Sequence, residues 1–145
     1  MSFLGNLFSR RNAVPEYPPV DKVSTVGRRL EEVEPELQEL MSKVSQPLEV
    51  VPAEHAAYVF IGKPPSSFGL AWIHDGTVSG LNTLIQEHGV APAQVEKVVD
   101  ELRSAYSRHQ DAQHFSATVG KRQVVVTASE GLENEVHEII ENILH

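Results

Sequence analysis

The sequence of 145 residues contains no cysteine. Disulfide bonds, thiolate metal sites and cysteine nucleophiles are therefore excluded, and histidine, with seven copies, is the strongest metal-ligating residue type left. Aromatic residues make up only 6% of the chain, and no apolar run approaches the roughly 18 residues of a membrane span. With 41% apolar and 22% charged residues, the composition indicates one ordinary soluble domain.

The first twelve residues lack acidic side chains, whereas the whole chain has 20 of them. Because this segment carries two arginines and the chain a net charge of −8, the remaining residues carry −10. A proline-rich stretch separates the two parts, and its fixed φ angles predict a semi-stiff, extended spacer. We therefore divide the chain into a basic amphipathic docking peptide (residues 1–12), a linker (13–22) and an acidic α+β domain (23–145).

The apolar residues of the docking peptide are spaced to share one face of a helix, with two arginines after them. Burying four such side chains contributes about 6–12 kcal/mol, whereas ordering the backbone costs on the order of 10–20 kcal/mol. Membrane binding by the peptide alone should be weak, and a preformed protein groove or oligomerisation suits it better. The predicted partner-binding residues are Phe3, Leu4, Leu7, Phe8, Arg10 and Arg11.

Three other interpretations of the docking peptide stay open. It could be a flexible tail, an arm folded back on its own domain, or an organelle transit peptide, since such peptides are also amphipathic, rich in arginine and poor in acids. Its arginines follow its apolar residues, and it has no long apolar core, so it does not have the pattern of a secretory signal.

Residues 23–45 carry apolar side chains at alternating spacings of three and four, the a and d pattern of a heptad repeat. Pro35 interrupts the pattern and predicts either a kink or two short helices, the second of which opens with this proline. The apolar face either packs on its own domain or pairs with another helix. The residues of this candidate helix-pairing seam are Val26, Leu30, Val33, Leu37 and Leu40.

The acidic domain should contain two β-hairpins. Residues 55–62 and 68–74 are rich in aromatic and β-branched residues, and residues 114–119 and 122–127 flank a Gly-Lys pair that suits a tight turn. Residues 48–51 form a short additional strand, and helices are expected at 78–88, 92–110 and 130–144. This order predicts an α+β fold: a single antiparallel sheet of four to five strands with helices packed on one face, preceded by a flexible amphipathic arm.

No catalytic motif is present, and we predict no catalytic residue, cofactor or metal site. No two histidines have the spacing that places both on one helical face. The acidic charge argues against nucleic acid as a partner. Residues 81–95 have the spacing of a helix-turn-helix. The would-be recognition helix begins with residues 93–100, which hold two acids and one base, so we interpret the segment as an ordinary helix pair.

Two hypotheses for function follow. The first is a non-catalytic, cytoplasmic accessory or adaptor subunit that docks through residues 1–12 to a larger protein complex, a protein shell or a membrane surface, with homo-oligomerisation through the seam. The alternative is a small-ligand- or metal-binding domain, enzymatic or not, with a pocket on the sheet at Lys63, Trp72 and His74. His55 and His114 are further candidates for that pocket, and His55 would fall opposite His74 if the strands of the first hairpin pair directly.

Overall fold

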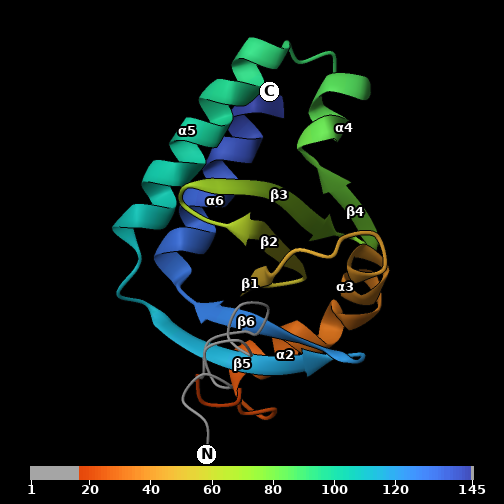
Figure 1. Cartoon of the computed structure of the whole chain (residues 1–145), viewed down its shortest axis with the longest axis vertical. Helices are drawn as coiled ribbons and strands as arrows, with labels where there is room; N and C mark the ends of the chain where they lie inside the picture. The colour runs from red at the N-terminus through yellow and green to blue at the C-terminus, as the bar shows by residue number, and fades with distance from the viewer. Residues whose placement is uncertain (1–16, 145) are drawn as a thin grey trace, which may run out of the picture.

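The computed structural model describes residues 17–144 (Figure 1). Along this part of the chain five helices and six strands follow one another. Their order is α2 (Thr25–Glu32), α3 (Glu34–Met41), β1 (Leu48–Ala53), β2 (Ala56–Lys63), β3 (Ser67–His74), β4 (Thr77–Gly80), α4 (Leu81–Gln86), α5 (Pro92–Arg108), β5 (Gln113–Val119), β6 (Arg122–Ala128) and α6 (Glu130–Leu144).

The six strands form one sheet in the order β4-β3-β2-β1-β6-β5. Both predicted hairpins are present, β2 with β3 and β5 with β6. The α+β class is thus confirmed, but the sheet has six strands rather than four or five. It is also mixed rather than antiparallel, because β1 pairs in parallel with β6. These two strands are distant in sequence, so tertiary packing, and no short turn, brings them together.

Helices cover both faces of the sheet, which corrects the expectation of helices on one face. On one face, α2 and α3 pack on the strands through a core that includes Leu37, Val50 and Val59. On the other face, α5 and α6 pack through a second core that includes Leu102 and Val51. Adjacent strand residues point to opposite faces, so the complete burial of both Val50 and Val51 requires cover on both sides.

Helices α2 and α3 replace the single heptad helix, as the position of Pro35 predicts. Pro35 lies in the first turn of α3, where its missing N–H removes no helical hydrogen bond. The side chain of Ser24 caps α2 by accepting a hydrogen bond from the Gly27 amide. At the other end of the chain, Ser129 caps α6 as predicted, accepting from the Leu132 amide at 3.0 Å.

The start of the helix expected at 78–88 is wrong, because residues 77–80 form the edge strand β4. Asp75 and Gly76 both have positive φ (50° and 74°), as a two-residue hairpin turn requires, and this turn brings β4 against β3. The helix α4 then begins at Leu81, where the Gly80 amide donates to the Thr83 hydroxyl at 3.0 Å. Between residues 17 and 144, no helix is long and apolar enough to cross a membrane.

Candidate interaction site

The linker is attached to the edge of the sheet before it reaches the first helix. The Ser116 amide of β5 donates to the Pro18 carbonyl, and the Val20 amide donates to the Ser116 carbonyl, both at 2.9 Å. The Ser116 hydroxyl also donates to the Tyr17 carbonyl at 3.0 Å. A short parallel bridge therefore covers part of an edge strand that would otherwise be open.

The predicted docking residues Phe3, Leu4, Leu7, Phe8, Arg10 and Arg11 lie outside the described residues. The described chain begins at Tyr17, and the hydrogen bonds to Ser116 fix this starting point on β5. Whatever residues 1–12 bind, they are connected to the domain at one defined place.

A series of contacting polar side chains extends from Tyr17 into the domain. The Tyr17 and His114 rings lie 5.1 Å apart, centroid to centroid. One carboxylate oxygen of Glu49 accepts from the Thr127 hydroxyl at 2.5 Å, and the other accepts from the Tyr106 hydroxyl at 2.7 Å. Because the Thr127 hydroxyl proton is used in this way, the His114 Nδ1, 3.0 Å from Thr127 Oγ1, must be the donor. The network thus joins the linker, β5, β6, β1 and α5.

The environment of Tyr106 keeps its hydroxyl protonated at neutral pH. Burial, and then the hydrogen bond to Glu49 and its charge, raise the pKa of the Tyr106 hydroxyl above its ordinary value. Tyr106 therefore stays a donor. Thr127 is the polar side chain most deeply buried among residues 17–144, and it both donates to Glu49 and accepts from His114. A buried hydroxyl with both roles filled stabilises a single arrangement.

The residues of the candidate helix-pairing seam lie in the core of their own domain. Leu30, Val33, Leu37 and Leu40 are buried against the sheet, and Val26 packs beside them. The apolar face of α2 and α3 is therefore occupied by strands of the same chain, and we no longer assign it to a partner helix.

The three predicted pocket residues do not come together. Lys63 pairs with Ser67 at one end of the β2–β3 hairpin, and His74 pairs with Ala56 at the other end. Seven residues of extended strand separate these ends, roughly 23 Å at about 3.3 Å per residue. Trp72 is partly buried and packs on the core under α5 and α6, while the exposed His74 pairs with Asp75 at 3.1 Å.

The other histidine of this region, His55, lies in the turn between β1 and β2, next to the partner of His74. Its Nδ1 is 3.3 Å from a Glu32 carboxylate oxygen. Both residues line an open cavity of about 360 Å³ together with Glu36 and Asp75. In the described part of the chain, no three His, Asp or Glu side chains are grouped so that they could hold a metal ion.

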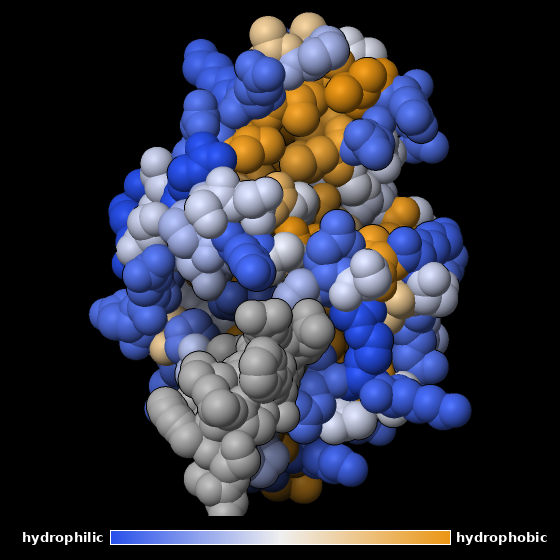
Figure 2. Space-filling view, viewed as in Figure 1, coloured by the Kyte–Doolittle hydropathy of each residue, from blue (hydrophilic) through white to orange (hydrophobic). Residues whose placement is uncertain are grey.

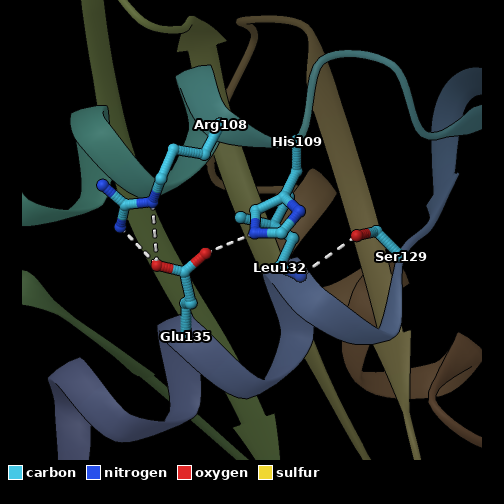
Figure 3. Close-up of polar contacts among 5 residues, drawn as sticks. All are labelled: Arg108, His109, Ser129, Leu132 and Glu135. Carbon is cyan, nitrogen blue, oxygen red and sulfur yellow. Dashed lines mark hydrogen bonds and ion pairs between the residues drawn. The ribbon is translucent and has the colours of Figure 1, made fainter.

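A second polar cluster fastens α5 to α6 (Figure 3). Arg108 and His109, at the end of α5, both point toward Glu135 of α6, and each binds one of its carboxylate oxygens. The hydrogen bond from Arg108, followed by that from His109, lowers the pKa of Glu135. These contacts hold the end of α5 against α6.

A groove of about 580 Å³ runs beside this cluster between α5 and α6. Four carboxylates line it and two basic side chains face them, so its net charge is negative. The lining residues with charge are Lys97, Asp100, Glu101, Arg108, Glu135 and Glu138. Ile139 adds an apolar contact to the same lining.

An apolar surface lies between α5 and α4 (Figure 2). Ile85 of α4 is 38% exposed, one of only two large apolar side chains among residues 17–144 that count as exposed. Leu81 of α4 and Ile143 and Leu144 of α6 are partly accessible and continue into the core below. Single exposed apolar residues are ordinary, but a contiguous group on neighbouring helices indicates a contact surface.

Sequence reasoning missed Glu49, Thr127 and Ile85. An acid between Leu48 and Val50 in an otherwise apolar strand is a signal that could have identified Glu49, because a carboxylate there needs buried donors. No signal marks Thr127, since threonine is common in strands. Ile85 could have been noted as an apolar residue close to the expected end of its helix.

Comparison of the chain with models of protein families, with curated proteins and with solved structures finds no match.

Proposed function

We propose that this protein is a non-catalytic accessory subunit, an adaptor that docks to a protein surface through residues 1–12. The observation that carries the proposal is the contrast between two parts of one chain. The first twelve residues hold four large apolar side chains and two arginines without any acid, whereas the rest carries −10. A segment of this composition should bind most tightly to a partner surface that is both apolar and acidic.

The attachment of the linker supports this function. Hydrogen bonds at 2.9–3.0 Å hold residues 17–20 on β5, and the Tyr17 ring lies against His114. A peptide connected at a fixed point loses less freedom on binding than one at the end of a long loose chain. Only residues 13–16 remain between the docking peptide and this attachment, so a bound partner would lie close to the domain.

A protein surface suits the peptide better than a membrane surface. The gain from four buried apolar side chains and two arginines near anionic lipids is about the same size as the backbone ordering cost. A preformed protein groove reduces that cost and adds specific contacts to the arginines. Docking to a membrane is therefore an outcome of the experiment below rather than the leading expectation.

The experiment compares two tagged full-length chains in native cell lysate, the wild type and the Phe3→Ser/Phe8→Ser variant. We expect the wild type to retain a protein partner that the variant loses, with circular dichroism unchanged. The matched control is Val23→Ser, which changes an apolar side chain that is 71% exposed on the domain. Equal recovery of partners by wild type and variant would contradict the proposal, and lipid recovery alone would move it to the membrane.

A further inference from the structure

We propose that the docking site for residues 1–12 is the apolar surface between α4, α5 and α6, on a second copy of the same chain. This inference rests on the proposed function and names the partner of the docking peptide. In the resulting dimer, each copy would insert its docking peptide into the other copy.

The first step is chemical complementarity. The surface offers Ile85 and Leu81 from α4 and Ile143 and Leu144 from α6, all at least partly accessible. These side chains fit the apolar face of the docking peptide, whose four large residues have helical spacing. Figure 2 shows hydrophilic residues on both sides of the surface, as expected for the rim of a contact site.

The second step is charge. The acidic groove between α5 and α6 adjoins the apolar surface, because Ile139 lines the groove and Ile143 follows it one turn later on the same side of α6. Asp100 of this groove is engaged by Arg103, and Glu135 by Arg108, whereas Glu101 and Glu138 are exposed. Two free carboxylates beside an apolar surface match a peptide whose apolar residues are followed by Arg10 and Arg11.

The third step is the reach of the docking peptide, which favours a second copy over the same chain. Tyr17 lies at β5, one edge of the sheet, and α4 follows β4, the opposite edge. Five strand spacings separate these edges, about 24 Å in a straight line through the domain. Nine residues from Tyr17 to Phe8 span at most about 30 Å when fully extended. A path around the helices to the same chain's own surface is longer than this straight line and requires a fully extended peptide. A fully extended peptide no longer has its apolar side chains on one helical face.

The fourth step is energetic. A single docking peptide gains about as much as its ordering costs, so one contact is weak. In a two-fold dimer the same contact occurs twice, and the second one forms within a complex that already exists. Reciprocal exchange therefore turns a weak peptide into a stable association without any additional contact.

Sedimentation equilibrium on full-length chains tests the inference. We expect the wild type to have twice the 16.0 kDa mass of one chain. The Phe3→Ser/Phe8→Ser variant and the Ile85→Glu variant should each sediment as single chains, with self-association weakened at least about tenfold. Val23→Glu, which adds the same charge at a distant exposed site, should remain a dimer.

Mixing the two defective variants gives the sharper result. One has an intact apolar surface and the other an intact docking peptide, so the mixture can form one contact. Its association should be weaker than that of the wild type but stronger than that of either variant alone. If Ile85→Glu loses its circular dichroism signal, Ile85→Ser replaces it.

Three results would overturn the inference: a wild type that is a single chain at every concentration, an Ile85 variant that associates as the wild type does, or a mixture that associates no more strongly than either variant alone. If Phe3→Ser/Phe8→Ser loses a different protein in lysate while Ile85→Glu keeps it, only the inference fails. If neither variant changes any association, the proposed function fails with it.

Discussion

The ring of Tyr17 lies against the imidazole of His114, with 5.1 Å between centroids and planes tilted by 34°. This contact connects the last linker residues to a network that ends at Glu49 in β1, the third strand from the edge. The place where the docking peptide leaves the domain is thus connected to the interior of the sheet by side chains as well as by backbone hydrogen bonds.

Replacing Tyr17 by Ala should loosen the attachment of the linker without unfolding the domain. An aromatic pair of this kind contributes about 0.5–1.5 kcal/mol, so the loss in global stability should be small. The local effect should be larger, and we expect faster hydrogen exchange at the Val20 and Ser116 amides, which form the bridge. His88→Ala, at an exposed position after α4, serves as the control. Unchanged exchange in Tyr17→Ala would show that the backbone bonds alone hold the linker.

Replacing Glu49 by Gln should destabilise the fold by about 1–3 kcal/mol. Both carboxylate oxygens accept hydrogen bonds, from Tyr106 and Thr127. In glutamine an NH2 group replaces one of the two oxygens. That NH2 group cannot accept the hydrogen bond that Tyr106 or Thr127 donates. Urea denaturation measures the difference, with Glu54→Gln as the control because Glu54 is exposed in the turn after β1. Equal stability of the two variants would argue against the network.

Leu37→Ala distinguishes a core residue from a helix-pairing residue. Leu37 is 0% exposed and packs on the sheet, so its truncation should cost about 2–5 kcal/mol of folding free energy. The oligomeric state measured by light scattering should not change. Normal stability combined with a change from oligomer to single chain would instead restore the seam as an interface.

Glu135→Gln should remove part of the acid sensitivity of the domain. Because Arg108 and His109 lower the folded-state pKa of Glu135 below 4.5, its contribution is complete above about pH 4.5 and is lost as pH falls through the folded-state value. The stability difference between wild type and variant should therefore be constant near neutral pH and shrink below 4.5. Burial raises the pKa of the nearby Glu133, so this group makes the opposite contribution to the pH dependence of stability. Glu133 is present in both proteins, and its contribution cancels in the difference between them.

Thermal unfolding across pH 3 to 7 measures this difference. Glu96→Gln, at an exposed position on α5, is the control and should follow the wild type. A Glu135→Gln curve parallel to the wild type at every pH would show that the ion pairs drawn in Figure 3 add no stability.

Local signals predicted most individual elements. The proline at the start of α5, the serine cap of α6 and the glycine turn between β5 and β6 each determine structure within a few residues, and these elements lie where they were expected. Pro35 likewise divides α2 from α3. These features depend on backbone geometry and capping, which act over one or two turns.

The arrangement of the elements could not be predicted in the same way. The parallel pairing of β1 with β6 joins residues more than 70 positions apart, and no turn specifies it. Residues 50–53 form a continuous apolar run and are all buried. Such a run indicates that helices cover both faces of the sheet, since a strand with one exposed face alternates apolar and polar residues. The strand β4 was missed because four residues are too few for a periodic pattern, and its pairing with β3 decides its conformation.

The candidate site was only partly predictable for a related reason. The composition of residues 1–12 indicates a docking peptide, but the apolar surface forms only when α4 and α5 are placed side by side. The network of Glu49, Thr127 and Tyr106 similarly combines two strands and a helix. Residues that are distant in sequence form these sites through tertiary packing.

The most direct test of the docking function is one of sufficiency. Residues 1–20 are fused to an unrelated monomeric carrier, and the carrier is presented to the proteins that bind the full-length chain, including the full-length chain itself. The account predicts that the fused carrier captures the same partner and that a Phe3→Ser/Phe8→Ser fusion does not. A fused carrier that captures nothing, while full-length Phe3→Ser/Phe8→Ser still binds its partner, would contradict the account.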